Sequence, residues 1–264
     1  MVDQTDNIKT STTEIAPEIA PELSVVVPVH NEADNIEPLI GEIQAALDGV
    51  IGYEIIYIND CSRDGTPEKL ITLNRKIDVL RVLTHQKQSG QSAAVRSGVR
   101  AARAPLVATL DGDGQNNPAD IPNLLKAYGE QAAADPKVMI CGHRAKRQDS
   151  FVKRLSSKIA NGVRSSLLGD STPDTGCGLK VFRAQDFVDL PNFDHMHRFL
   201  PALMIRSGGR VSSVEVSHRP RERGKSKYGT LDRLWVGIID MFGVMWLKRR
   251  AINPEVEEGA EKRK

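Results

Sequence analysis

The chain has 264 residues and a formal net charge of +2, from 36 Lys and Arg against 34 Asp and Glu. This length can bury the core of one large domain, and the near balance of charge does not favour a nucleic-acid partner. Cys61, Cys141 and Cys177 form no CxxC pair, so we expect neither a disulfide framework nor a zinc site, in keeping with a reducing compartment.

The two ends of the chain differ in composition from the middle. Residues 1–22 are rich in Thr, Glu, Ile and Pro, which predicts a disordered leader with no secretory signal. The longest apolar stretch, 234–247, is shorter than the roughly 20 residues that a membrane-spanning helix needs, so we expect no bilayer crossing. We divide the rest into a catalytic domain (23–230), an amphipathic interfacial helix (231–250) and a charged tail (251–264).

Strand-like and helix-like segments alternate through the first half of the chain. Apolar, β-branched runs predict strands at 23–29, 53–60, 79–85, 105–111 and 138–144. Helical spacing predicts helices at 30–47, 67–77, 90–102 and 118–131. This order predicts an α/β fold, a mostly parallel sheet flanked by helices on both faces.

The alternation weakens after residue 144. A basic segment (146–158) and a predicted loop (168–182) precede a helix-like segment (197–209). The run 210–220 predicts a further strand, with Val211, Val214 and Val216 facing inward.

Polar residues follow three of the predicted strands. Asn31, Asp60 and Asp111 each stand where a strand ends, and ligands of such sheets bind beyond the carboxyl ends of the strands. Asp111 and Asp113, one residue apart in DGDGQ, can share a divalent cation with a diphosphate, and their hard oxygen ligands suit Mg²⁺ or Mn²⁺. The motif alone is equally typical of a polar turn. Its neighbours at the same edge favour the metal site.

The motifs VVVPVHNEADNI, IYINDCSRDGT and ATLDGDGQ, in this order, resemble the family 2 glycosyltransferases of the GT-A fold. The later HRFLPAL and RPRERGKSKYG resemble the polyprenyl-phosphate branch of that family, the dolichol-phosphate mannosyltransferase type. The resemblance covers roughly 23–250. It implies a GT-A Rossmann-like catalytic domain that moves a sugar from a UDP- or GDP-sugar to a polyprenyl phosphate.

The resemblance also implies roles for individual residues. It places the nucleoside against four residues: Pro28, His30, Glu32 and Asp60, with Asp111 also contacting the nucleotide. It assigns the metal to Asp111, Asp113 and Gln115, with Asp111 and Asp113 as catalytic residues.

Basic residues offer a site for the acceptor phosphate, because guanidinium and ammonium groups suit a phosphate monoester. The candidates are Arg144 (also a candidate catalytic residue), Arg154, Arg221, Ser226 and Lys227. A solvated face is the alternative for such residues, and we prefer it for Lys146, Arg147, Lys153 and Lys158. A phosphate oxygen needs no strong general base, so we expect direct displacement with inversion.

Several other residues have plainer interpretations. Cys177 is typical of a buried free thiol, and His195 and His197 of solvated or capping residues. Asp174 matches a family position near the acceptor but could equally hold its own turn.

The predicted C-terminal helix carries an apolar stripe: Trp235, Ile238, Ile239, Phe242 and Trp246. Core packing is the common explanation of such a stripe, but the tryptophans and the basic residues 248–250 favour a membrane interface. We therefore expect a peripheral protein at the inner face of the cytoplasmic membrane. A separate membrane protein partner is left open.

Two other functions fit less well. A glycosyltransferase with a saccharide hydroxyl acceptor would need a catalytic base, and no carboxylate after Asp113 stands out for it. A non-catalytic nucleotide-sugar sensor would be expected to lack one of Asp60, Asp111 or Asp113, and all three are present.

Overall fold

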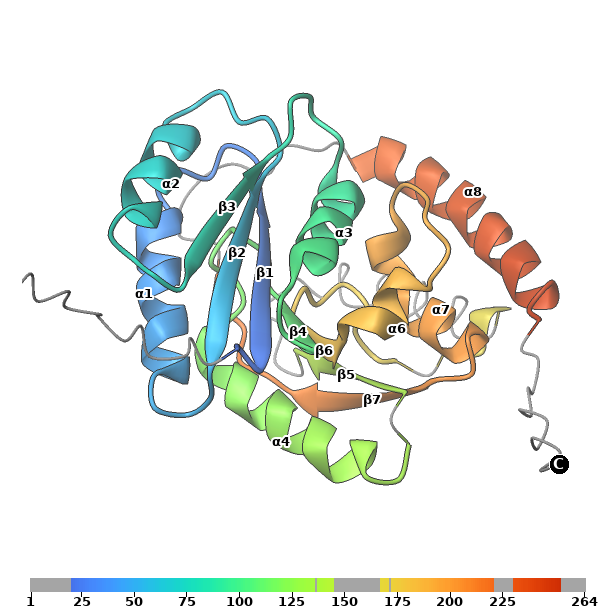
Figure 1. The fold of residues 1–264 in the computed structure, drawn as a ribbon. Coiled ribbons are helices and arrows are strands. Elements are labelled where there is room, and N and C mark those ends of the chain that lie inside the picture. The colour runs from blue at the N-terminus through green and yellow to red at the C-terminus, as the bar shows by residue number, and fades with distance from the viewer. Residues whose placement is uncertain (1–19, 136, 145–166, 171, 221–229, 253–264) are drawn as a thin grey trace, which may run out of the picture.

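The computed structural model describes residues 20–135, 137–144, 167–170, 172–220 and 230–252 (Figure 1). Most of the predicted leader, the basic segment 146–158 and most of the charged tail lie outside these residues, as do Arg154, Arg221, Ser226 and Lys227.

A seven-stranded sheet forms the centre of the fold. Its order is β3-β2-β1-β4-β6-β5-β7, and only β6 runs antiparallel to its neighbours. The strands are β1 (Leu23–Val29), β2 (Tyr53–Asn59), β3 (Leu80–Thr84), β4 (Leu106–Thr109), β5 (Val138–His143), β6 (Lys180–Arg183) and β7 (Arg210–Glu215). The mostly parallel α/β sheet expected from the sequence is confirmed.

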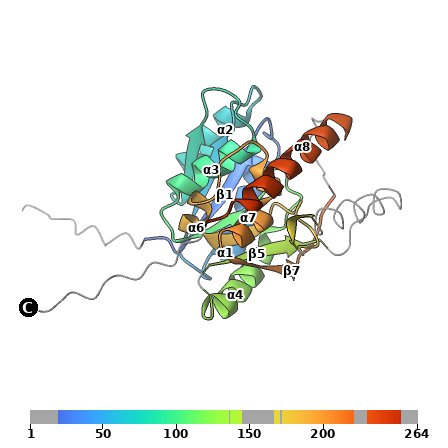
Figure 2. The same ribbon diagram turned by 90° about the vertical axis from the view of Figure 1, so that its right-hand side faces the viewer.

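Helices cover both faces of this sheet (Figures 1 and 2). One face packs on α1 (Ile36–Leu47), α2 (Thr66–Asn74) and α4 (Ile121–Ala132), the last preceded by the short η1 (Pro118–Asp120). The other packs on α3 (Gln91–Ala101), α6 (Ala184–Val188), η2 (Met196–Arg198), α7 (Leu200–Arg206) and α8 (Thr230–Arg249).

The two covered faces explain the continuous apolar sequence of the central strands. In β1, Val25 and Val27 enter the core beside α1, while Val26 enters the core beside α3. A strand buried on both faces has no solvent side on which polar residues would alternate. In β7, likewise, Val211 packs on one core and Val214 on the other.

The structure corrects the predicted loop 168–182 at its end. Lys180–Arg183 form β6, which pairs antiparallel with β4 and β5. The strand is only four residues long, too short for its pattern to be distinguished from an apolar loop. Its place between β4 and β5 brings the preceding residues 174–178 beside the end of β4.

Helix α8 has two different faces over its described side chains. Val244 is fully buried, and Met241 and Met245 pack beside it. Ile239, Phe242 and Trp246 are 68%, 62% and 62% exposed. One face of this helix packs on the core, as the core-packing interpretation expected, and another is open, so the membrane interface stays a prediction. No helix in the described part of the chain has the length and hydropathy needed to span a bilayer.

Candidate active site

The carboxyl ends of β1, β2 and β4 meet at one edge of the sheet and open into a pocket of about 390 Å³. This volume is in the range of small-molecule sites. Residues from both halves of the chain line it, among them Pro28, His30, Glu32, Asp60, Gln91, Asp111, Asp113, Gly178, Lys180, His197 and Arg198. Six of the residues predicted for the nucleotide and the metal are thus together in one cavity.

Asp60, at the end of β2, holds the loop between β3 and α3. Its Oδ1 accepts a hydrogen bond of 2.8 Å from the backbone N–H of Ser89, and its Oδ2 one of 2.8 Å from that of Gly90. His85 Nδ1 lies 2.8 Å from Oδ1, and His85 Nε2 lies 2.9 Å from Ser97 Oγ on α3. The carboxylate, 4% exposed, therefore shapes this wall of the pocket before any ligand enters.

The residues after β1 are tied to those after β2. His30 Nδ1 lies 2.7 Å from the carbonyl oxygen of Asp60. Glu32 accepts a hydrogen bond of 2.8 Å from Asn35 Nδ2, and its own backbone N–H donates to Thr66 Oγ1 at 3.0 Å. The predicted nucleoside residues are held by their neighbours at the mouth of the pocket.

Asp111 and Asp113 lie in a turn after β4 that packs tightly on its surroundings. The N–H of Asp111 donates to Asn116 Oδ1 at 3.2 Å, and Asp113 Oδ1 accepts from the N–H of Gln115 at 3.1 Å. A side chain at Gly178 would overlap the Asp111 carboxylate. Glycine is therefore required there for the residue 174–178 loop to lie against Asp111.

The electrostatics of this turn suit a cation. Burial, and then the neighbouring charge of Asp113, raise the pKa of Asp111 to about 6, against the opposing effects of Lys180, Arg144 and the hydrogen bond from Gln91. A shared divalent ion would stabilise the two neighbouring negative charges. No group of three or more His, Cys, Asp or Glu side chains suited to a metal occurs among the described residues, so diphosphate oxygens or water would complete the ligand set.

Arg144, at the end of β5, is engaged within the protein. Its Nε lies 2.7 Å from Asp174 Oδ2 and its Nη2 3.0 Å from Asp174 Oδ1. Arg144 is not among the pocket-lining residues, although its charge opposes the protonation of Asp111. Asp174, for which an acceptor role and a turn role were both open, holds this guanidinium.

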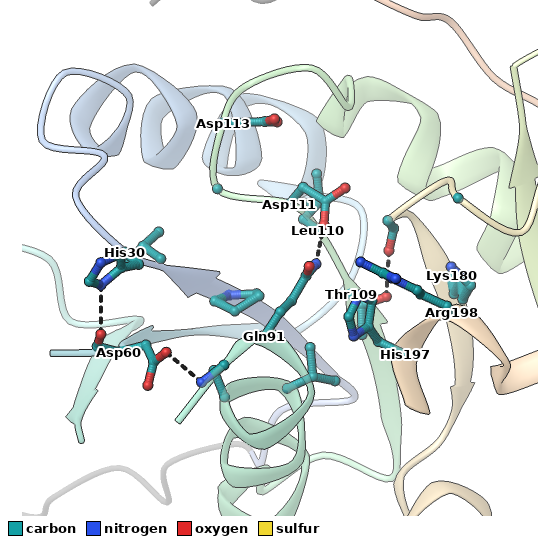
Figure 3. Close-up of a pocket in the computed structure, with 18 of the residues that line it drawn as sticks. His30, Asp60, Gln91, Thr109, Leu110, Asp111, Asp113, Lys180, His197 and Arg198 are labelled. Atoms are coloured by element: carbon teal, nitrogen blue, oxygen red, sulfur yellow. Dashed lines mark hydrogen bonds between the residues drawn. The ribbon is translucent and has the colours of Figure 1, made fainter. Parts of the chain in front are cut away.

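Four residues of the inner wall were not predicted as site residues: Gln91, Lys180, His197 and Arg198 (Figure 3). Gln91 Nε2 donates to Asp111 Oδ1 at 2.8 Å. The interpretation of His197 as solvated or capping is wrong, because its Nδ1 lies 2.7 Å from Ser92 Oγ within the pocket wall. Burial, with the nearby charges of Arg198 and Lys180, lowers the pKa of His197 to about 3.

The interpretation of Cys177 agrees with the structure, in which it is a fully buried free thiol whose pKa is raised by burial. His195 takes the N-cap position of η2 in the left-handed region, with φ of 60°, but its side chain makes no capping hydrogen bond. Its Nδ1 lies 3.2 Å from Asp240 Oδ2 of α8. Gln115 is outside the pocket lining, so its role as a metal ligand stays a prediction.

Comparison with known proteins gives this geometry a context. A family model described as glycosyl transferase family 2 matches residues 24–190. The dodecaprenyl-phosphate galacturonate synthase of Rhizobium johnstonii is 34% identical over 244 residues, which is 88% of this chain and 69% of that protein. The undecaprenyl-phosphate 4-deoxy-4-formamido-L-arabinose transferase of Edwardsiella ictaluri is 34% identical over 213 residues, 79% of this chain. This chain spans 63% of that second relative's length.

Solved structures show the same fold. The glucosyl-3-phosphoglycerate synthase from Mycobacterium tuberculosis, in complex with Mn²⁺, UDP and phosphoglyceric acid, aligns with a TM-score of 0.62 at 18% identity. The alignment covers 89% of this chain and 80% of that one. The aspartate pair after β4 and the loop held by Asp60 both lie within the matched residues 24–190, and the chain belongs to glycosyl transferase family 2.

Proposed function

We propose that the protein transfers a sugar from a nucleoside diphosphate sugar, with UDP as the first nucleotide to test, to a polyprenyl phosphate, with inversion at the anomeric carbon. The names of two relatives support the acceptor class, since both are prenyl-phosphate sugar transferases. The pocket supports the donor class, because it joins the predicted nucleoside residues to the Asp111 and Asp113 pair.

The observation that carries this proposal is that each carboxylate of the pocket already has a hydrogen-bonding or proposed metal-binding role. Four carboxylates line the pocket in the described part of the chain: Glu32, Asp60, Asp111 and Asp113. Asp60 accepts from two backbone amides, and Glu32 accepts from Asn35. Asp111 and Asp113 are the pair suited to a metal. A hydroxyl acceptor would need one of them as a base, whereas a phosphate acceptor is already anionic.

The transfer step then needs no proton movement on the protein. An acceptor phosphate oxygen forms a bond to the anomeric carbon as the bond from that carbon to the donor's β-phosphate oxygen breaks. The nucleoside diphosphate leaves with the electron pair, and a covalent sugar on the enzyme is not formed. Positioning and electrostatic stabilisation of the leaving group supply the rate.

Asp111 and Asp113 would hold Mg²⁺ or Mn²⁺, with Gln115 as a further candidate. When bound, the ion supplies positive charge that stabilises the departing diphosphate. Gln91 fixes one oxygen of Asp111, and Lys180 and Arg198 add positive charge to the inner wall. Arg154, Arg221, Ser226 and Lys227 remain our candidates for the acceptor phosphate, with Arg144 as a residue that positions the site.

We also propose that the protein works as a peripheral protein on the inner face of the cytoplasmic membrane, because a polyprenyl phosphate stays in the bilayer. The open face of α8 supports this: it presents Ile239, Phe242 and Trp246 together, with Arg249 and Arg250 exposed at the end of the helix. An apolar stripe beside cations is suited to an anionic lipid surface.

The proposal is tested by incubating the protein with Mn²⁺ or Mg²⁺, a panel of UDP- and GDP-sugars and a short polyprenyl phosphate. Mass spectrometry of the lipid fraction detects the product, and NMR of that product reports its anomeric configuration. We expect a lipid-linked sugar that disappears with Asp113→Ala but persists with Asp78→Ala, a change at an exposed aspartate of the surface.

Two results would contradict the proposal. Donor binding without lipid product across the panel would favour a hydroxyl acceptor or a sensor. An α-linked product from an α-linked donor would rule out direct displacement with inversion.

A further inference from the structure

Arg198 is a cation of the pocket whose guanidinium has no carboxylate partner among the described residues. Its side chain lines the cavity from η2, and its guanidinium makes no hydrogen bond or ion pair with the described residues, while its backbone N–H donates to the carbonyl oxygen of His195. Arg144, Arg183 and Arg219 show the contrast, since each holds a carboxylate through two nitrogens. A guanidinium left open in a ligand cavity is suited to a planar anion of the ligand.

The neighbours of Arg198 form a compact inner wall with little other charge. Lys180, 3% exposed, donates from Nζ to the carbonyl oxygen of Cys177 and is directed toward its own loop. His197 is held against Ser92 and stays neutral at neutral pH. Ala94 and Leu200 add apolar surface. Such a wall offers a pyranose ring apolar contact, a neutral hydrogen-bonding group and one free cation.

Arg198 enters the pocket from the side opposite His30 and Asp60. Figure 3 shows His30 and Asp60 at one side of the pocket, Asp111 between, and His197 and Lys180 at the other side, from which the side chain of Arg198 reaches toward Asp111. In the proposed function the nucleoside lies on the first side and the diphosphate beside Asp111 and Asp113. The sugar, which follows the diphosphate, would then extend toward Arg198.

We infer that Arg198 binds a carboxylate of the transferred sugar, so that the enzyme prefers donors whose sugar is a uronic acid. This inference rests on the proposed function for the order of nucleoside, diphosphate and sugar along the pocket. Two parallel hydrogen bonds from the guanidinium to the carboxylate would replace water on both groups. A neutral sugar, with a hydroxymethyl group in that place, would leave the cation without its partner.

Binding of matched donors tests this without an acceptor. Isothermal titration with Mn²⁺ present would compare UDP-galacturonate with UDP-galactose, and UDP-glucuronate with UDP-glucose. Each pair differs only by the carboxylate. We expect the wild type to bind at least one uronate about tenfold or more tightly than its neutral partner, the range of a charged hydrogen bond. Arg198→Gln should remove this preference while changing the affinity for UDP by less than about twofold.

Arg210→Gln, a change at an exposed arginine of β7, is the matched control and should keep the preference. Circular dichroism and melting would confirm that each variant is folded. If Arg198→Gln fails to fold, the inference is tested by the binding of the matched donors to the wild type. Equal affinity for uronate and neutral donors overturns the inference.

Two further outcomes would also overturn it. Equal weakening of UDP and every UDP-sugar would assign Arg198 to the diphosphate. Unchanged donor binding with a raised KM for polyprenyl phosphate would assign it to the acceptor. A uronate preference without any lipid product would instead contradict the proposed function and leave the binding inference standing.

Discussion

Arg144 and Asp174 form a two-point ion pair, Nε to Oδ2 at 2.7 Å and Nη2 to Oδ1 at 3.0 Å, with side chains only 9% and 6% exposed. The pair joins the end of β5 to the loop that precedes β6. Cys177 in that loop donates from its backbone N–H to the Asp174 carbonyl oxygen, and Gly178 lies against Asp111. Arg144 therefore supports the loop that packs against Asp111.

Breaking this pair should destabilise the fold as well as the site. Arg144→Gln leaves a buried carboxylate without its cation, which costs about 3 kcal/mol or more of unfolding free energy. We expect a comparable loss for Asp174→Asn and a smaller-than-additive loss for the double variant, measured by urea unfolding. Additive losses would contradict the coupling. Turnover should fall in both single variants, with Kd for UDP changed less than kcat.

Gly178→Ala should disturb Asp111 in a protein that still folds. The added methyl group would overlap the Asp111 carboxylate, so this side chain must move away from the position in which Gln91 holds it. We expect Mn²⁺-dependent UDP binding to weaken by about tenfold or more, in the range seen when supporting contacts of metal ligands are lost. Isothermal titration measures it.

Gly129→Ala is the matched control for that change. A methyl group at Gly129, on α4, would meet nothing within 4 Å, and alanine favours the helix by about 1 kcal/mol. This variant should melt at an equal or higher temperature and bind UDP normally. Normal metal-dependent binding by Gly178→Ala would show that the Asp111 position is not constrained as the structure implies.

Asp60→Asn should open the wall of the pocket on the side proposed for the nucleoside. The amide replaces one oxygen with an N–H₂ group, which faces the backbone N–H of either Ser89 or Gly90. An unsatisfied buried donor costs about 1 to 3 kcal/mol. We expect a lower melting temperature and about tenfold weaker UDP binding, with and without Mn²⁺. If binding were lost only when Mn²⁺ is present, Asp60 would belong to the metal site instead.

The first half of the fold could be predicted because each strand is apolar throughout and each is followed by a helix with regular spacing. The polar residues at the ends of β1, β2 and β4 then had to meet at one edge, and they do. The parallel sheet itself imposes this meeting, so no side-chain geometry was needed to expect it.

The inner wall could not be predicted because its residues come from α3, η2 and β6, an antiparallel strand that is only four residues long. In the sequence, Lys180 is a single cation within an apolar run. It comes beside Asp111 because β6 pairs with β4. His197 and Arg198 belong to HRFLPAL, a motif that the sequence marks without showing which way its side chains face. The order of charged and apolar residues along the chain could not reveal that the side chain of Arg198 lines a cavity.

Stability should depend on pH through His197. Its folded pKa is lowered to about 3, whereas an unfolded histidine takes up a proton near pH 6.5. Between these values the unfolded chain binds more protons, so stability is complete above about pH 6.5 and falls as pH decreases, by up to about 1.4 kcal/mol per unit. Urea unfolding from pH 8 to pH 5 should show this slope in the wild type. His197→Asn should reduce it, and an unchanged slope would assign the effect to other groups.

The open face of α8 should bind lipid when tested against vesicles. Phe242 and Trp246 are exposed on the same side of the helix, and serine at both positions removes apolar surface worth about 1.5 to 3 kcal/mol for each residue that becomes buried in lipid. We expect Phe242→Ser with Trp246→Ser to lower partitioning onto phosphatidylglycerol vesicles by at least about tenfold in sedimentation. UDP binding should persist, because Val244 on the buried face keeps the helix in place.

A matched control comes from the opposite part of the molecule. Ile71 on α2 is 52% exposed, so Ile71→Ser removes exposed apolar surface from another helix of the molecule. It should bind vesicles as the wild type does. Added salt should weaken wild-type binding, because Arg249 and Arg250 contribute about 1 kcal/mol each near an anionic surface. Equal losses in both serine variants would mean that binding follows general hydrophobicity, and α8 would then have no special role at the membrane.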